Sequence, residues 1–125
     1  PDVRPIALDR ILSALRVEFA PRARSRGLTF AVPETGLFVA SDVQMLRRVL
    51  QNLVSNAIRY TAQGSVTVTA TAEGDQVVVA VTDTGPGIAA HEQRVVFEEF
   101  RRLDATRSIP GHGLGLAIVR RSCAK

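Results

Sequence analysis

Two amides, a cation and an aromatic ring recur at helical spacing near the middle of the chain. At about 100° per residue, the side chains of Asn52, Asn56, Arg59 and Tyr60 fall within one quadrant of a helix, away from its leucine stripe. An amide oxygen can serve Mg²⁺ as a single ligand when phosphates supply the charge. A cation can contact phosphate oxygens, and an aromatic ring can pack on a base. Taken alone, the segment favours the plain solvated face of an amphipathic helix.

A second candidate segment, Asp-Thr-Gly-Pro-Gly-Ile from Asp83 to Ile88, follows an apolar run that has the composition of a buried strand. Gly85 and Gly87 would let a ligand approach the backbone closely. The carboxylate of Asp83, at the end of a strand, can accept a hydrogen bond from a ligand N–H group. Because Asp-x-Gly also forms ordinary turns, the segment alone favours a plain loop.

A third segment, Gly-His-Gly-Leu-Gly-Leu from Gly111 to Leu116, leads into an apolar stretch. Glycines that enter a helix place unpaired backbone N–H groups and the positive end of the helix dipole at one spot, which suits a phosphate. The segment lacks the Gly-Lys-Ser/Thr of a P-loop, and it follows a polar loop instead of the strand that a dinucleotide fingerprint requires. A flexible hinge before a helix is the alternative for this segment alone.

Two long helices are predicted to organise these segments. One runs from Ile6 to about Arg26 and weakens or bends at Pro21. The other runs from Val43 to about Tyr60, with Ser41-Asp42 as its N-cap, and it carries the first candidate face.

Short runs rich in branched or aromatic residues are predicted as strands at 28–32, 37–40, 65–71 and 76–82. The first two, on either side of a Pro-Glu-Thr-Gly turn, form two strands or a hairpin. The last two flank a Glu-Gly-Asp turn and are predicted to be adjacent and antiparallel, the second buried on both faces. Further helices are predicted near 91–97 and from about Gly113. This order implies an α+β fold, a two-layer α/β sandwich whose mixed, mostly antiparallel sheet is covered by helices on one face.

The composition narrows the classes of protein. A chain of 125 residues, 46% hydrophobic and 22% charged, suits one folded domain and not a disordered tail. Its formal net charge of +4 suits a polyphosphate as well as a nucleic acid. No apolar run approaches the roughly 18 residues of a membrane span. The single cysteine, Cys123, excludes an internal disulfide and a multi-cysteine metal site, and it fits a cytoplasmic location.

In their order along the chain, the segments resemble the N, G1, F and G2 boxes of sensor histidine kinases. The matching stretches are Asn56-Ala57 with Arg59-Tyr60-Thr61, then 83–88, 97–100 and 111–116. The resemblance covers essentially all of the chain as the catalytic, ATP-binding domain. It implies the Bergerat-type α/β sandwich shared with gyrase, mismatch-repair and heat-shock chaperone ATPases.

The resemblance implies a role for each matched residue. Asn56 would hold Mg²⁺, and Arg59 would contact phosphate. Tyr60 would cover the adenine of ATP, and Asp83 would accept the adenine amino group. The glycines of the last box would cradle the phosphates. The other positions that the resemblance assigns to the ATP site are Gly85, Gly87, Ile88, Phe97, Phe100, Gly111, His112, Gly113, Leu114, Gly115 and Leu116.

The resemblance also implies catalytic positions, which include Asn56. The stretch between Phe100 and Gly111 looks like an ATP lid, whose Arg102 and Arg107 match basic positions near the γ-phosphate. A solvated loop is the alternative. Asn52 stands where water-hydrolysing relatives carry a glutamate. Because an amide cannot accept the proton of an attacking water, we expect no efficient ATPase activity.

The implied function is the binding of Mg-ATP and transfer of its γ-phosphoryl group to a histidine on a separate hairpin domain, with a response regulator downstream. Neither His91 nor His112 resembles that acceptor. We therefore interpret residues 1–125 as the catalytic domain alone, truncated before the strands that end its relatives. No nucleic acid or membrane contact is expected. A non-catalytic nucleotide-binding module and an anti-sigma-type serine kinase are the alternatives.

Overall fold

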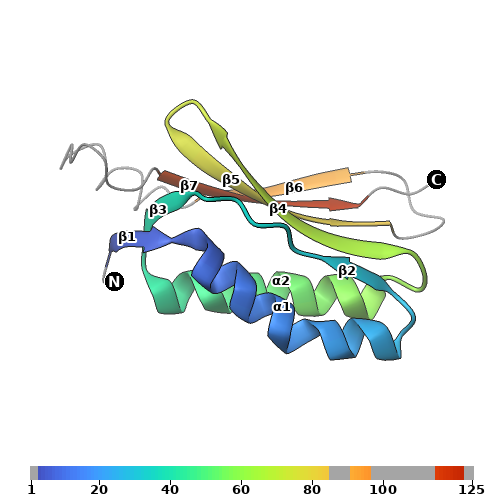
Figure 1. The fold of residues 1–125 in the computed structure, drawn as a ribbon. Coiled ribbons are helices and arrows are strands. Elements are labelled where there is room, and N and C mark those ends of the chain that lie inside the picture. The colour runs from blue at the N-terminus through green and yellow to red at the C-terminus, as the bar shows by residue number, and fades with distance from the viewer. Residues whose placement is uncertain (1–2, 85–90, 97–114, 123–125) are drawn as a thin grey trace.

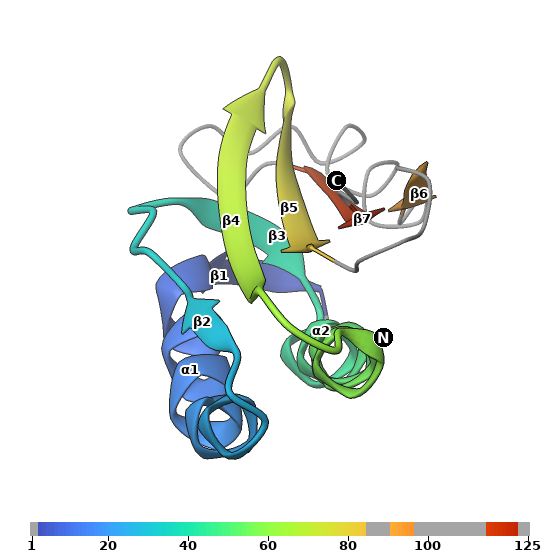
Figure 2. The same ribbon diagram turned by 90° about the vertical axis from the view of Figure 1, so that its right-hand side faces the viewer.

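The computed structural model describes residues 3–84, 91–96 and 115–122 (Figure 1). In chain order its elements are β1 (Arg4–Ala7), α1 (Leu8–Ser25), β2 (Thr29–Ala31), β3 (Phe38–Ser41), α2 (Val43–Tyr60), β4 (Ser65–Glu73), β5 (Gln76–Asp83), β6 (His91–Val96) and β7 (Gly115–Ser122). The main sheet has the order β2-β4-β5-β7-β6, and β1 pairs with β3 separately. Both helices lie on the same side of the main sheet (Figure 2), which confirms the predicted α+β sandwich.

Helix α2 has the predicted bounds because its start and its buried side are both encoded locally. The side chain of Asp42 accepts a hydrogen bond from the Met45 N–H at 3.1 Å, as an N-cap does. The buried residues recur every three or four positions and face α1 and the sheet: Leu46, Leu50, Val54, Ala57 and Ile58. The opposite side of the helix is left for polar residues.

Strand β1 includes Ile6 and Ala7, the first two residues of the helix that the residue pattern predicts. Ile6 and Leu8 are both buried, two residues apart, so the chain between them is extended. Ile6 lies opposite Val39 in the antiparallel pair with β3, and the Leu8 N–H donates to the Leu37 carbonyl at 3.0 Å. Helix α1 therefore begins only at Leu8.

Helix α1 continues through Pro21 without interruption. A proline inside a helix removes one N–H donor and leaves the carbonyl four residues earlier without its helical partner. That carbonyl belongs to Val17, whose residue is 74% exposed, so water can reach this side of the helix.

The two predicted strands at 28–32 and 37–40 exist as β2 and β3, but they do not form a hairpin. β2 runs parallel to β4, whereas β3 runs antiparallel to β1. The intervening loop is instead held by α1. The Asp9 carboxylate accepts hydrogen bonds from the Gly36 N–H at 2.8 Å, the Thr35 N–H at 2.9 Å and the Thr35 hydroxyl at 2.9 Å. This clasp directs the chain away from β2.

Replacing Asp9 with asparagine is expected to lower the free energy of unfolding by about 1–2 kcal/mol near neutral pH, because charged hydrogen bonds are lost. The hydrogen bond from the Gly36 N–H, helped by those from Thr35 and opposed by burial, holds the pKa of Asp9 below its ordinary value of 3.8. A carboxylate with a lowered folded-state pKa stabilises above its unfolded pKa, and this stabilisation is lost as the pH falls through the folded pKa.

Denaturant unfolding of the wild type and Asp9→Asn at several pH values checks this. The difference in stability should narrow below about pH 3.8. Asp75→Asn, at an exposed hairpin turn, is the matched control and should have little effect. A difference that stays constant across this pH range would contradict the clasp.

Strands β4 and β5 form the predicted antiparallel hairpin. Glu73 pairs with Gln76 across a two-residue turn, whose Gly74 has φ of +63° and so adopts a conformation that glycine favours. All residues from Val77 to Val81 are buried, as predicted for a strand covered on both faces. Val77, Val79 and Val81 pack with the helices, whereas Val78 and Ala80 join Ala117 and Val119 in a second cluster.

Two predicted helices are wrong. Residues 91–96 form strand β6, which pairs antiparallel with β7, and residues 115–122 form β7, which lies parallel to β5. The apolar run Leu116–Val119 is buried on both sides, as in an internal strand. Periodicity cannot distinguish so short an apolar run from a buried helix turn, and its β-branched residues favour the strand.

Among the described residues, neither helix combines the length and the apolar character needed to cross a bilayer.

Candidate functional site

Asp83 is the last residue of β5, and it is only 4% exposed. Side chains alternate along a strand, so Asp83 lies on the same face as Val77, Val79 and Val81, which pack with the helices. Its partners in the sheet are Val66 of β4 and Ser122 of β7. A carboxylate is therefore buried at the end of a central strand, on the side of the sheet that faces the helix layer.

The last turns of α2 present the predicted polar face. Asn52, Arg59 and Tyr60 are exposed and Asn56 is half-buried, while Ala57 on the same turns is fully buried. The spacing argument thus places the four side chains correctly on the polar side of α2, and their chemical roles stay predictions. The guanidinium carbon of Arg59 lies 5.8 Å from the centre of the Tyr60 ring, within the range of a cation–π contact.

Arg22 in the last turn of α1 and Arg26 directly after it contact the last turns of α2, and the sequence interpretation missed both. A guanidinium nitrogen of Arg26 donates to the Arg59 carbonyl at 3.0 Å, and one of Arg22 donates to the Ser55 hydroxyl at 3.3 Å. Arg22 also lies 5.1 Å from the centre of the Phe19 ring. Nothing in the spacing of these arginines distinguishes them from a solvated face, because their contacts depend on how α1 packs on α2.

A third set of contacts joins the segment after α2 to the end of β5. The Ser65 N–H donates to the Thr84 hydroxyl oxygen at 2.9 Å, and the Thr84 N–H donates to the Ser65 carbonyl at 3.2 Å. The Thr29 N–H donates to the Gly64 carbonyl at 3.0 Å. The chain that leaves Tyr60 is therefore fixed directly beside the chain that leaves Asp83.

Most of the predicted glycine-box and lid residues lie outside the described residues: Gly85, Gly87, Ile88, Phe97, Phe100, Arg102, Arg107, Gly111, His112, Gly113 and Leu114. Gly115 and Leu116 are described, and they open β7. Gly115 pairs with Gln76, whereas Asp83 pairs with Ser122, so seven strand positions, or about 23 Å, separate Gly115 from Asp83.

The structure therefore does not bring Gly115 and Leu116 to Asp83. Leu116 is fully buried in the core. Because β7 is a strand, the predicted helix dipole is also absent from the described residues 115–122, and the phosphate argument that depended on it does not apply there.

The described residues contain no group of three or more histidine, cysteine, aspartate or glutamate side chains that could hold a metal ion. A divalent cation at this end of α2 would need most of its oxygen ligands from a bound molecule and from water.

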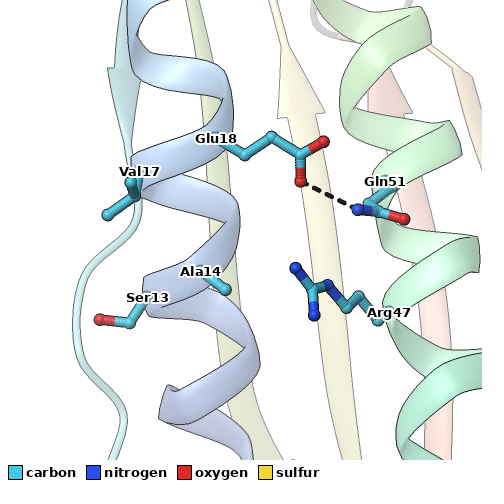
Figure 3. Close-up of a pocket in the computed structure, with 6 residues that line it drawn as sticks. All are labelled: Ser13, Ala14, Val17, Glu18, Arg47 and Gln51. Atoms are coloured by element: carbon cyan, nitrogen blue, oxygen red, sulfur yellow. Dashed lines mark hydrogen bonds between the residues drawn. The ribbon is translucent and has the colours of Figure 1, made fainter.

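A separate groove of about 500 Å³ lies between the two helices (Figure 3). Its lining residues are Ser13, Ala14, Val17, Glu18, Arg47 and Gln51. The Gln51 amide donates to the Glu18 carboxylate across it at 2.9 Å. Neither Asp83 nor any other predicted site residue lines the groove, so it is not the site that the sequence predicts.

Residues 41–125, more than half of the chain, match the family model described as histidine kinase-, DNA gyrase B- and HSP90-like ATPase. The sensor-like histidine kinase SenX3 of Mycolicibacterium smegmatis is 40% identical over 99% of this chain and 33% of its own length. The chain spans a third or less of the first curated relatives that it matches.

Solved structures of histidine kinases also resemble the fold of this chain. The nucleotide-free catalytic domain of histidine kinase ThkA matches with a TM-score of 0.61 and 26% identity, over 71% of this chain and 63% of that one. Full-length ShkA in complex with AMPPNP matches with a TM-score of 0.61 and 31% identity, over 70% of this chain and 20% of that one. The chain thus belongs to the histidine kinase-, DNA gyrase B- and HSP90-like ATPase family, as a catalytic domain of the sensor histidine kinase type.

Proposed function

We propose that this domain binds Mg-ATP between the end of β5 and the end of α2 and transfers the γ-phosphoryl group to a histidine on a separate hairpin domain. The observation that carries the proposal is the buried carboxylate of Asp83, which faces the helix layer beside the polar end of α2. The parent protein would be a sensor kinase with this domain in the cytoplasm and a response regulator as the downstream partner.

Asp83 would recognise the base. Its carboxylate can only accept hydrogen bonds when ionised, and the amino group of adenine is a donor. Guanine presents a carbonyl oxygen at the equivalent position, and two acceptors would then face each other. The exposed ring of Tyr60 would pack on the base, and Arg59 would contact phosphate oxygens.

Asn56 would be the protein ligand of Mg²⁺. It is half-buried on α2 and offers one neutral oxygen, which fits a cation that takes few protein ligands and binds mainly phosphate and water. The bound cation would neutralise the phosphate oxygens. The sequence assigns Arg102 and Arg107 to the same task at the γ-phosphate.

Asn52 bears on the fate of the phosphoryl group. It lies on the exposed side of α2, one turn before Asn56, and its amide cannot take a proton from water. The domain would therefore leave its bound ATP unhydrolysed until an acceptor histidine is available. The complex of AMPPNP with the relative ShkA supports nucleotide binding in this family.

Incubation with radiolabelled Mg-ATP tests the proposal. Alone, the 125-residue chain should neither label itself nor hydrolyse ATP appreciably. With the cognate hairpin domain added, an acid-labile, base-stable label should appear on the hairpin. Acid-stable label on a partner serine would favour the serine kinase instead, and ATP binding with no transfer to any acceptor would favour the nucleotide-binding module.

A further inference from the structure

The contact between Thr84 and the Gly64-Ser65 backbone lies where the chain that follows α2 meets the chain that leaves β5. Thr84 directly follows Asp83, Gly64 ends the short loop that begins after Tyr60, and Ser65 opens β4. Two hydrogen bonds join them, from the Ser65 N–H to the Thr84 hydroxyl at 2.9 Å and from the Thr84 N–H to the Ser65 carbonyl at 3.2 Å. They extend the β4–β5 pairing one residue beyond Asp83.

Gly64 can lie this close to Thr84 because it has no side chain. Its φ is +114°, and a Cβ atom added to it would overlap the Thr84 hydroxyl oxygen and come within 3.2 Å of the Thr84 Cβ. Gly27, Gly36 and Gly74 also have positive φ, but an added Cβ would meet nothing within 4 Å at any of them. Among these four glycines, only Gly64 therefore has a neighbour that requires the absence of a side chain.

We infer that Gly64 and Thr84 form a latch that sets the position of the Asp83 carboxylate relative to the end of α2, and so sets the discrimination between adenine and guanine. The inference rests on the proposed function. Both residues are positioning residues, because they act through the backbone on either side of the site. A carboxylate distinguishes the two bases only when its acceptor oxygen meets the amino group at hydrogen-bond distance, so a small displacement weakens ATP binding more than GTP binding.

The matched pair Thr84→Val and Thr84→Ser isolates the hydroxyl. Valine keeps the branched shape and removes the acceptor for the Ser65 N–H, whereas serine keeps the acceptor. We expect Thr84→Val to reduce the ratio of ATP to GTP affinity by about tenfold, and Thr84→Ser to retain the wild-type ratio. Gly64→Ala should act in the same direction, because its methyl group displaces the Thr84 hydroxyl.

Gly74→Ala is the control for backbone strain. It has a positive φ and open space around it, at the opposite end of the hairpin from Asp83. It should lower the melting temperature but leave the ATP to GTP ratio unchanged. The ratio is the decisive quantity, because a loss of stability alone lowers the amount of folded protein without changing which base it prefers.

Calorimetric titration of the 125-residue chain and its variants with ATP and GTP measures the affinity ratio, and melting curves measure stability. A wild type that binds no ATP would overturn the proposed function and the latch together. A selective wild type with an unchanged ratio in Thr84→Val would overturn the latch alone, as would an equal loss in Thr84→Ser or Gly74→Ala. If Gly64→Ala does not fold, the threonine pair still decides.

Discussion

Replacing Asp83 with alanine is expected to abolish measurable ATP binding, and the wild type should prefer ATP to GTP by about tenfold to a hundredfold. The physical reason is the burial of this carboxylate, which is 4% exposed at the end of β5. A hydrogen bond to a charged group contributes about 1.5–3 kcal/mol, and each 1.4 kcal/mol is tenfold in affinity. With guanine, the same carboxylate meets a carbonyl oxygen and the bond cannot form.

Asp83→Asn sharpens the test without changing the size of the side chain. An amide can donate to the guanine oxygen as well as accept from adenine, so the preference for ATP should fall. Asp75→Ala, which removes an exposed carboxylate at the hairpin turn, should bind both nucleotides like the wild type. Calorimetric titration measures all four proteins. Equal affinity of the wild type for ATP and GTP would remove this role from Asp83.

Asn56→Ala is expected to weaken Mg-ATP binding about 10–100-fold while leaving the affinity for adenosine unchanged. Only the triphosphate end of the ligand needs the cation, so the two affinities should separate. Transfer to the hairpin domain should fall with Mg-ATP binding. In Gln51→Ala, which removes a half-buried amide of α2 that lies outside the predicted site and contacts Glu18, both affinities should stay at wild-type values. A parallel loss of adenosine binding would show that Asn56 supports the fold of the site and not the metal.

Local rules were sufficient for the elements whose signals lie within a few residues. The Asp42 cap and the leucine stripe define α2, and the short turn at Gly74 defines the β4–β5 hairpin. The same rules could not predict β1, because its extended conformation depends on pairing with β3. They were wrong for β6 and β7, since short segments adopt the conformation that their neighbours in the sheet impose.

In the candidate site, too, some features follow from the local sequence and others depend on how the elements pack. The side of α2 that carries Asn56 and Tyr60 follows from helical geometry. The sequence placed Asp83 after a buried strand, and the structure adds that Asp83 is itself the last residue of that strand and is buried. The latch between Gly64 and Thr84 joins residues twenty positions apart, and nothing in either local sequence indicates the other. Contacts that set the relative placement of two elements are visible only once those elements are packed.

The two-residue turn between β4 and β5 also bears on the order in which the strands pair during folding. A hairpin of this kind closes in about 1–10 μs, whereas pairing β2 with β4 or β5 with β7 must first close a loop of about thirty residues. Folding should therefore proceed outward from this hairpin. The strand that carries Asp83 is then expected to order early and to serve as the template on which the later strands find their register.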